Sequence, residues 1–461
     1  MKNINIKKVL LVVLVILGCI IRDRNIYVLI PLLLLVLWKE KKEKILYYSG
    51  LIGAGYGVLG LSLEGFITNR GIFLMLISII GQYLYKKKKV EIPYKPIIYT
   101  YIFILFGGIV WNLLSPEGIT GVGRFISVNK KFIFIILLYN IINTEEKFKR
   151  IIDIFIGGVV LTGIYGIYQY INIYNQYGKN LNNIDWYRIP GFTNILYTAA
   201  VLMMGSLLLF GKIWDSFSFK NRKDIFYGIG FLISSLGLLL TKTRACIIGY
   251  ILGTLLIIIL KRNLKKTLLL LGILLGIFLI TPKPIKENIF ERVSQITFKE
   301  NNRNENTASD NLRRVMWRGS IYAWENNKIF GVGSRGTGKW LQEYADKNTD
   351  EKGMVAYGVT RSSFTFQEAH CMYLNYLSEV GLFSLSYLIL LFIIIPKLIL
   401  KIYRAKKQYE GEFLGVIGAI LAYYFLGTVW SVWGYFGTTQ EVFQFMIFIL
   451  IYIYKNKSQD I

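Results

Sequence analysis

The sequence is poor in the side chains that build metal and redox sites. It contains a single histidine, His370, and three cysteines, Cys19, Cys246 and Cys371, in 461 residues. The cysteines have neither metal-ligand nor disulfide spacing, so they indicate nothing about the redox compartment. A zinc or iron site built from histidine and cysteine is therefore not expected, and we predict no metal and no cofactor.

Acidic residues are also scarce relative to basic ones. The chain has 28 Asp and Glu against 54 Lys and Arg, which gives a formal net charge of +26. In a soluble protein this excess would suggest nucleic acid binding. Here the lysines lie in short connections between apolar runs, which is the pattern of membrane topology signals. We therefore expect a lipid bilayer around the chain and no nucleic acid partner.

The chain is rich in long apolar runs. Apolar residues make up 54% of it, the mean hydropathy is +0.45, and the runs are continuous rather than periodic. This pattern predicts an all-α, polytopic transmembrane helix bundle of about 12–14 helices. No internal repeat is visible. The runs lie near 9–21, 26–38, 45–63, 71–85, 97–114, 125–142, 151–171, 191–210, 225–240, 245–260, 267–281, 372–395, 413–433 and 438–454.

The distribution of charge predicts the domain organisation and the orientation. Residues 1–281 are predicted to form the first eleven helices, 282–371 a large extracytoplasmic loop, and 372–461 the C-terminal helices. The positive-inside rule places both basic termini in the cytoplasm, as expected for a multi-pass protein of the cytoplasmic (inner) membrane. The first apolar run lacks a small-x-small cleavage site, so we expect it to be retained. Within the loop, 313–326 predicts a helix and 331–336 a turn-rich segment.

The two sides of the membrane differ in their basic residues. The predicted cytoplasmic connections carry mostly lysine, whereas the short outward connections carry mostly arginine. Topology requires only positive charge, so a preference for the planar, bidentate guanidinium indicates recognition of phosphate or carboxylate. The alternative is that these side chains simply reach to lipid headgroups. The outward set comprises Arg22, Arg24, Arg70, Arg124, Arg188 and Arg244, and the loop adds Arg292, Arg303, Arg313, Arg314, Arg318, Arg335 and Arg361.

His370 is the strongest candidate for a catalytic residue. An apolar run begins just after it, so the imidazole is predicted at a helix N-terminus on the outer face, where the helix dipole favours the neutral ring. A neutral imidazole can act as a general base. The alternative is a histidine that serves only the membrane interface. Glu379 follows nine residues later, about 13 Å deeper on the same helix, either holding an arginine in a polar cavity or capping the junction between helices.

Three arginines at predicted helix ends share the outer side with His370. Arg188 lies in Arg188-Ile189-Pro190-Gly191, Arg244 follows Thr243, and Arg314 precedes Trp317 by one helical turn. Guanidinium groups gathered in this way suit a diphosphate.

These segments resemble the O-antigen ligase and polymerase family of polytopic bacterial membrane proteins. The stretch from His370 to Leu382, read as His-x-x-Tyr-Leu-x-x-Leu-x-Glu-x-Gly-Leu, is similar to that family's signature. Arg314-x-x-Trp followed by Ile329-Phe330-Gly331-Val332-Gly333 resembles a second segment, and Arg188-x-x-Gly191 and Thr243-Arg244-Ala245 match two further arginine positions. The chain departs from the pattern at Cys371, where the family usually has Asn, and at Lys328-Ile329, where it usually has Pro-Leu.

The resemblance implies a GT-C-like fold and transfer of a glycan from undecaprenyl diphosphate to an acceptor hydroxyl of a glycan or glycolipid, without a metal, as in lipopolysaccharide and other polysaccharide biosynthesis. His370 would be the general base of an inverting displacement. Arg188, Arg244 and Arg314 would bind the diphosphate, with Glu379, Gly381, Gly331 and Gly333 in supporting roles. The absence of Asp-x-Asp from the predicted outer loops agrees with chemistry that uses no metal.

Other functions are also compatible with parts of the pattern. A polymerase that extends one lipid-linked glycan with another would need the same donor chemistry, although the His-x-x-Tyr-Leu signature favours a ligase. A polysaccharide transporter or flippase often has two related halves and ionisable residues at mid-membrane. Here the halves differ and the charges lie at helix ends. A purely structural membrane protein gives no reason for the outward arginines.

Overall fold

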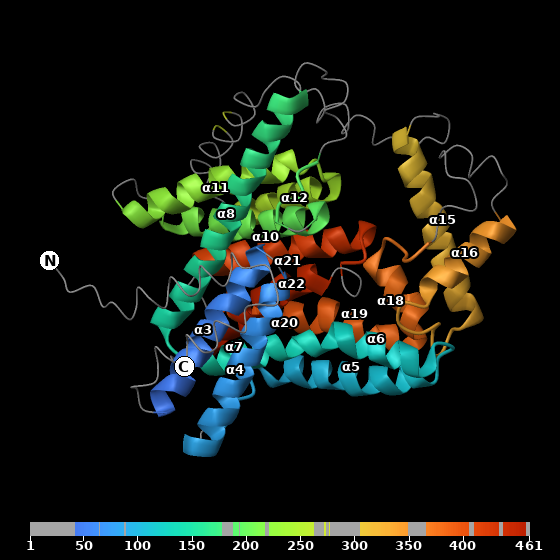
Figure 1. The fold of residues 1–461 in the computed structure, drawn as a ribbon, viewed down its shortest axis with the longest axis horizontal. Coiled ribbons are helices and arrows are strands. Elements are labelled where there is room, and N and C mark those ends of the chain that lie inside the picture. Colours follow the sequence, from blue (N-terminus) through green and yellow to red (C-terminus); the bar gives the residue numbers. More distant parts are fainter. Residues whose placement is uncertain are drawn as a thin grey trace. The chain divides into compact units, whose positions relative to one another are not determined.

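The structure is a computed structural model of an all-α chain. Within the ranges it describes, the chain forms helices joined by turns and contains no strand, which confirms the predicted fold class (Figure 1). The predicted helices at 9–21 and 26–38, and the one at 267–281 except for residues 272 and 276, lie outside these ranges. The described residues are 42–63, 65–86, 89–177, 188–192, 194–216, 221–261, 272, 276, 305–348, 366–404, 410–432 and 437–457.

Seven of the described helical segments are long and apolar enough to cross a membrane. Each has at least 18 residues, close to the roughly 20 that span a hydrocarbon core. The protein is therefore a multi-pass membrane protein. The segments are Lys95–Leu113, Glu145–Gln176, Ile195–Trp214, Arg222–Leu240, Arg244–Lys261, Met372–Arg404 and Glu410–Val429.

The chain forms two compact units, residues 1–93 with 133–161 and residues 94–132 with 162–461. In the first unit, α3 (Lys42–Leu63) packs against α4 (Gly65–Lys86) and α7 (Ile133–Ile141). A Cβ atom added at Gly71 would lie 2.4 Å from the backbone nitrogen of Gly57, so the backbones of α3 and α4 touch. Helix α8 (Glu145–Tyr177) continues from the first unit into the second.

The predicted continuous helix at 125–142 is interrupted. Helix α6 (Gly118–Asn129) ends in a 3₁₀ turn, η2 (Lys130–Phe132), before α7 begins. The interruption coincides with polar residues inside the apolar run. Asn129 donates its side-chain amide to the carbonyl of Phe125, and Lys131 Nζ lies 2.5 Å from Glu441 Oε1. The predicted single helix is thus divided by a 3₁₀ turn, and the polar side chains at this turn have partners within the protein.

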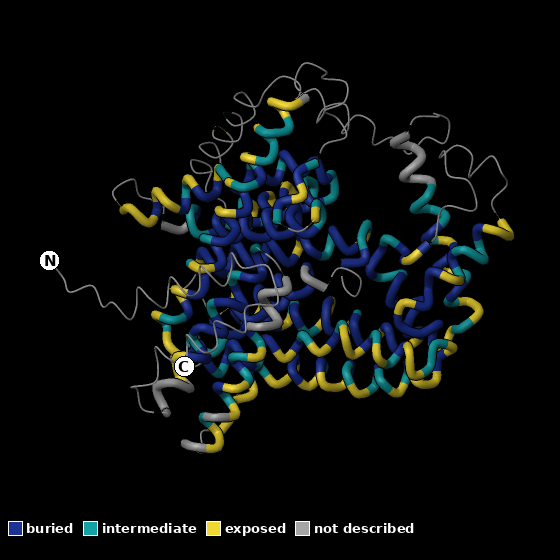
Figure 2. The backbone as a smooth tube through the Cα atoms, in the orientation of Figure 1, coloured by how far each residue is buried: buried dark blue, intermediate teal, exposed yellow. Residues whose placement is uncertain are grey.

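The second unit is built around three closely packed helices, α10 (Ile195–Ser216), α12 (Arg244–Lys261) and α21 (Glu410–Val429), which we call the scaffold (Figure 1). A Cβ atom added at Gly415 of α21 would lie 2.7 Å from Leu208 Cα of α10. Small residues let the backbones approach in this way, as is common between membrane helices. Most scaffold residues are buried, whereas α5 (Lys95–Leu113) exposes apolar side chains along one side (Figure 2).

The glycine contacts also fix the direction of the scaffold helices. On α12, Gly249 meets the backbone of Ala422 on α21, and Gly253 meets that of Gly418, so the two helices are antiparallel. Helix α10 is antiparallel to α21 in the same way. The N-termini of α10 and α12 therefore lie at the C-terminal end of α21. At the opposite end, ion pairs join Lys212 to Glu412 at 2.6 Å and Lys261 to Glu410 at 2.8 Å.

The apolar run at 372–395 is not one regular helix. It comprises α18 (Met372–Val380), a 3₁₀ turn η3 (Gly381–Phe383), α19 (Ser384–Ile389), a π-helical turn η4 (Leu390–Ile394) and α20 (Ile395–Arg404). Gly381 has a φ of +55°, which ends α18. The π turn ends two residues before Pro396, whose missing N–H cannot complete a regular helical ladder. Helices α11 (Arg222–Leu240) and α22 (Gly437–Lys457) complete this unit around the scaffold.

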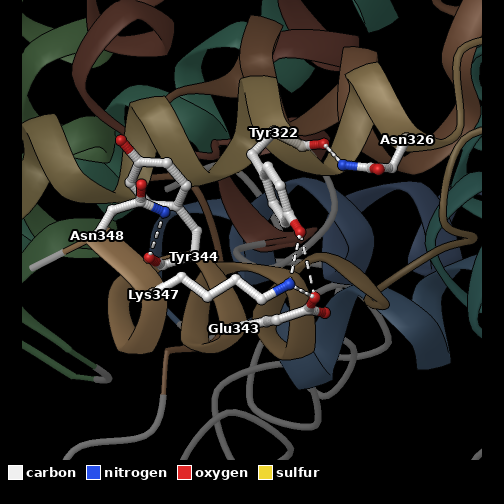
Figure 3. A network of polar contacts seen from close by, with 6 residues as sticks. All are labelled: Tyr322, Asn326, Glu343, Tyr344, Lys347 and Asn348. Carbon is white, nitrogen blue, oxygen red and sulfur yellow. Dashed lines mark hydrogen bonds and ion pairs between the residues drawn. The ribbon is translucent and has the colours of Figure 1, made fainter.

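The predicted loop contains two helices, α15 (Glu305–Asn326) and α16 (Thr337–Asn348). The helix predicted at 313–326 is thus confirmed, and it begins eight residues earlier. The helices share a small apolar core that Phe366 joins. On the other face, Tyr322 and Lys347 both donate to Glu343 Oε1, at 3.1 and 2.7 Å (Figure 3). Hydrogen bonds from Lys347 and Tyr322 lower the pKa of the Glu343 carboxyl, and the bond to Glu343 raises the pKa of Lys347.

Candidate functional site

His370 lies where the predicted loop enters the helix bundle. Helix α18 begins at Met372 with Cys371 as its N-cap, so the predicted position of the histidine beside a helix N-terminus is confirmed. The backbone of His370 has a φ of +46°, in the left-handed region. Residues other than glycine rarely adopt this conformation, and where they do the surrounding contacts must hold them there.

The imidazole of His370 is held between an acid and an aromatic ring. Its Nδ1 lies 3.2 Å from Glu368 Oε1, and its ring meets the edge of Trp430 at 4.5 Å between centroids, with an interplanar angle of 85°. The histidine side chain is 29% exposed, whereas that of Glu368 is 6% exposed. The ring is thus accessible on one side and enclosed on the others, as a proton acceptor for a bound substrate should be.

Glu368 and Trp430 were not among the residues that the sequence singled out. Glu368 had a usable signal, because an acid two residues before the only histidine is a plausible partner for that ring. Trp430 had none, because it lies 60 residues further along the chain, beyond α21 (Glu410–Val429). Its contact with His370 follows from the packing of α18 against α21, where Gly427 meets the Met372 side chain.

Glu379 is in the last turn of the short helix α18 rather than within a long helix as predicted. Its carboxylate accepts a hydrogen bond from Asn375 Nδ2 at 2.9 Å and one from the backbone N–H of Arg335. Its own carbonyl accepts from Gly333 N at 2.9 Å. These contacts tie the end of α18 to the turn after α15, so they fit the alternative in which Glu379 caps a junction between segments.

Gly331, Gly333 and Gly381 form the other half of this junction, which we call the glycine junction. All three have positive φ, between +55° and +91°. A Cβ atom at Gly331 would lie 2.4 Å from the carbonyl oxygen of Glu379, and one at Gly381 would lie 2.4 Å from that of Ile329. The two backbones therefore interlock, which places these glycines in supporting positions beside α18.

The turn after α15 is also held by α5. Asn112 Oδ1 accepts from the backbone N–H of Ser334 at 2.8 Å, and Trp111 Nε1 donates to the carbonyl of Ile329 at 2.9 Å. The segment from Ile329 to Ser334 is thus bonded on one side to a transmembrane helix and on the other to α18. This arrangement anchors the turn after α15 to α5 and α18.

Arg188 and Arg244 are brought together by the turn between α11 and α12. Arg188 donates from Nε to the carbonyl of Thr241 at 3.1 Å and from Nη2 to Thr243 Oγ1 at 2.9 Å. Arg244 is the next residue and the first of α12. Arg188 thus positions the turn that presents Arg244, and two of its five N–H groups are engaged there.

The segment around Arg188 is fixed by neighbouring helices. Gln169 of α8 donates to the carbonyl of Gly191 and accepts from its N–H, both at 3.0 Å. Thr198 of α10 donates to the carbonyl of Pro190 at 2.7 Å. The Arg188 segment therefore lies at the N-terminal end of α10.

Arg244 has a suitable environment for an anion. It is half-buried at the N-terminus of an 18-residue helix, where the helix dipole adds positive character. Lys242, two residues earlier, is 5% exposed and has a φ of +51°, so a second cationic side chain is enclosed nearby. Among the described residues, Arg244 makes no hydrogen bond or ion pair through its guanidinium.

Arg314 lies on α15, one of the two helices of the predicted loop. It is half-buried on α15, which packs against α18 and α16. Met316, two residues later, shares a core with Phe366, and Phe366 precedes His370 by four residues. The described non-glycine residues with positive φ are Tyr94, Lys242, Arg335 and His370. Lys242 lies two residues before Arg244, Arg335 lies just after the turn that contacts α18, and Tyr94 precedes α5.

The structure thus brings most of the predicted site to one end of the scaffold. Arg244 begins α12, Arg188 precedes α10, and both helices start at the C-terminal end of α21. Trp430, just beyond α21, contacts His370 at that end. Arg314 lies on α15, which packs against α18.

Comparison with known proteins finds a family match to part of the chain. Residues 229–389 match the family model described as O-antigen ligase, whereas no curated protein matches the chain. The matched segment includes Arg244, Arg314, His370, Glu379 and the glycine junction, and Arg188 lies before it. This match, together with the apolar helices, supports in general a glycan-transferring activity of ligase or polymerase type, lipid-linked glycan substrates and a membrane setting. The match covers roughly one third of the chain, and over this segment the chain is similar to the O-antigen ligase family.

Proposed function

We propose that the protein transfers a glycan from undecaprenyl diphosphate to an acceptor hydroxyl at the extracytoplasmic face of the cytoplasmic membrane. The observation that carries this proposal is the single accessible imidazole beside α18, at the same end of the scaffold as Arg244 and Arg188. A base and a cluster of cations are the two components that transfer from a diphosphate donor requires.

In the proposed reaction, the acceptor oxygen attacks the anomeric carbon of the donor sugar while His370 accepts the hydroxyl proton. The bond from that carbon to the diphosphate oxygen breaks, and its electron pair leaves with the lipid diphosphate. A single displacement of this kind inverts the anomeric configuration. General base catalysis by one side chain is worth roughly 10²- to 10⁴-fold in rate.

Arg244, with Arg188 and Arg314, stabilises the charge that builds on the departing diphosphate. Support comes from the half-buried position of Arg244 at the start of α12, since preorganised cations act strongly where water is partly excluded. This role is the one that a divalent ion fulfils in metal-dependent glycan transferases. We therefore expect transfer to continue in the presence of a chelator.

The direct test replaces His370 with Ala and assays transfer of a lipid-linked oligosaccharide by purified protein in lipid vesicles. We expect the rate to fall by roughly 10²-fold or more, while the donor still binds. Transfer at near-normal rates would remove His370 from the mechanism. NMR of the product would report the anomeric configuration, and retention would contradict a single displacement.

The arginine roles are tested with a matched pair on one helix. Arg314→Lys keeps the charge and removes the bidentate donor, whereas Arg318→Lys makes the same change at an exposed position of α15. We expect the first variant to lose transfer and the second to keep it. Equal activity of the two variants would remove Arg314 from the diphosphate site.

A polymerase would use the same donor site with a second lipid-linked glycan as acceptor. Offering the purified protein a lipid-linked glycan alone, and then together with a glycolipid acceptor, separates the two activities. Products that lengthen without the added acceptor would identify a polymerase.

A further inference from the structure

We propose that Glu368 is a positioning residue for His370. Its carboxylate holds the proton of the imidazole on Nδ1 and leaves Nε2 as the atom that takes the proton of the acceptor hydroxyl. This inference rests on the proposed glycan transfer and adds a residue that the family resemblance did not supply. Histidine bases in other enzymes are oriented by an acid in the same way.

The contact between the two side chains carries the proposal. Glu368 Oε1 lies 3.2 Å from His370 Nδ1, and the carboxylate is almost fully buried. The described residues provide no hydrogen-bond partner for Glu368 Oε2, and Nδ1 does not yet have hydrogen-bond geometry towards any acceptor. An enclosed carboxylate is costly without a partner, and the imidazole edge is the partner in contact. Catalytic hydrogen bonds in empty sites are often loose and tighten around the substrate.

The surrounding contacts keep the pair together. Ala369, between the two residues, donates its N–H to Asn375 Oδ1 at 3.4 Å, and Asn375 is in turn held by Glu379. The positive φ of His370 turns its side chain relative to the extended backbone before it. Trp430 packs against the ring in a T-shaped contact and leaves the ring partly exposed. The imidazole is thus fixed by an acid, an aromatic edge and a constrained backbone.

Cys371, directly after the histidine, is a weak hydrogen-bonding partner for a neighbouring group. Its side chain makes no cap hydrogen bond. Burial raises the pKa of the Cys371 thiol, so it stays neutral. Of the two acidic or thiol side chains near His370 in sequence, Glu368 is therefore the stronger acceptor, and it is the one in contact with the ring.

The proton balance of the step shows what Glu368 contributes. As the new bond to the anomeric carbon forms, the acceptor O–H bond breaks and an N–H bond forms at Nε2. His370 becomes an imidazolium, and the adjacent carboxylate stabilises its positive charge without taking the proton. The proton passes to solvent after the lipid diphosphate has left.

Kinetics separate this role from a structural one. We expect Glu368→Ala to lower kcat by roughly 10- to 100-fold with little change in KM for the lipid-linked donor, because the ring is misdirected but the cations remain. Glu368→Gln keeps an acceptor oxygen and should retain more activity. Glu325→Ala, an exposed acid on α15, is the matched control and should behave as wild type. A rise in KM with unchanged kcat, or full activity of Glu368→Ala, would overturn the proposal.

A double-variant comparison gives a second readout. If Glu368 acts only through the imidazole, Glu368→Ala should cause no further loss in the His370→Ala background. An additional loss of the same size as in the wild-type background would show that Glu368 acts independently of the histidine. This comparison needs only that both single variants fold.

The presence of only one histidine makes the tautomer directly observable. In full-length protein labelled with ¹⁵N-histidine and reconstituted in lipid, the imidazole signals arise from His370 alone. We expect a protonated Nδ1 and an unprotonated Nε2 above the titration range of the ring, and a mixture of tautomers in Glu368→Ala. Identical spectra for the two proteins would contradict the proposal.

The outcomes also distinguish this proposal from the one on which it rests. Near-normal transfer by His370→Ala would contradict the proposed function itself. A dead His370→Ala with a fully active Glu368→Ala of unchanged spectrum would leave the glycan transfer intact and remove only the role of Glu368.

Discussion

Glycine has different structural roles in the scaffold and in the glycine junction. In the scaffold, Gly249, Gly253 and Gly415 have ordinary helical backbones, and their missing side chains let α10, α12 and α21 touch. In the junction, Gly331, Gly333 and Gly381 have positive φ and also lie close to neighbouring segments. An added side chain would clash with a neighbouring segment in the scaffold. In the junction it would clash with a neighbouring segment and would also have to adopt a positive φ.

The difference shows what each region contributes. The scaffold is a closely packed set of regular helices, with Arg244 at one of its ends and the His370–Trp430 contact at the same end. The glycine junction fixes an irregular, non-helical segment beside α18. It does so through backbone hydrogen bonds, such as the one from Gly333 N–H to the Glu379 carbonyl. We therefore expect changes in the junction to affect the site more directly than changes in the scaffold.

The largest effect is expected for Gly331→Ala. The new methyl group would lie 2.4 Å from the Glu379 carbonyl and would also require a φ of +69°, so the turn must leave α18. We expect loss of glycan transfer and a clear fall in the thermal unfolding temperature of the purified protein. Wild-type activity would show that the junction is not needed at the site.

A smaller effect is expected for Gly415→Ala. Its Cβ would lie 2.7 Å from Leu208 Cα and 2.8 Å from the Leu207 carbonyl, so α10 and α21 must separate slightly. Loss of packing between membrane helices should lower the unfolding temperature, with transfer reduced in proportion to the folded fraction. A Gly415→Ala variant that is fully stable yet inactive would mean that the scaffold, like the junction, affects the site directly.

The α15–α16 pair provides a reference that is held by exposed charges. The lowered pKa of Glu343 means that its stabilising contribution is present above the pKa of an unfolded glutamate and is lost as pH falls through the lowered value. We expect Glu343→Gln to speed hydrogen exchange in α16 slightly at neutral pH relative to wild type, with the difference vanishing once the pH is below the lowered pKa. A difference that persists in acid would assign it to packing rather than charge.

The smallest effect, of opposite sign, is expected for Gly123→Ala. Gly123 lies on α6, and no atom comes within 4 Å of the place that a Cβ atom would take there. Alanine favours a helix over glycine by roughly 0.5–1 kcal/mol, so unfolding should shift slightly upward. A destabilised Gly123→Ala would mean that replacing a glycine costs stability even where no atom lies close to the new Cβ atom. The cost could then not be assigned to close contacts in the scaffold and the junction.

The sequence predicted the helices well where apolar runs were uninterrupted. The runs at 225–240 and 245–260 correspond to α11 and α12 within a few residues, because charged residues mark the ends of these runs. The runs at 125–142 and 372–395 were predicted as single helices and are broken. Their breaks at Lys130–Phe132 and Gly381 depend on partners distant in sequence, Glu441 and Ile329, which local patterning does not reveal.

The site was predictable to the extent that it lies in short motifs. His370 could be placed at a helix start because polar sequence changes to apolar there, and that position is confirmed. The hydrogen bonds from Arg188 to Thr241 and Thr243 join residues more than 50 positions apart. The contact of His370 with Trp430 arises only when α18 packs on α21. The catalytic and diphosphate-binding roles of the named residues remain predictions.

The length of the scaffold has a consequence for how a lipid substrate reaches the site. From Arg244 to Lys261, α12 covers 18 residues, a rise of about 26 Å and nearly the thickness of a hydrocarbon core. Arg244 therefore lies near one surface of the bilayer when Lys261 lies near the other. If Arg244 binds the diphosphate as proposed, a lipid whose diphosphate lies in the headgroup layer would reach it at its own depth. Lateral diffusion within one leaflet would then deliver the donor, with no need to draw its charge into the oily interior.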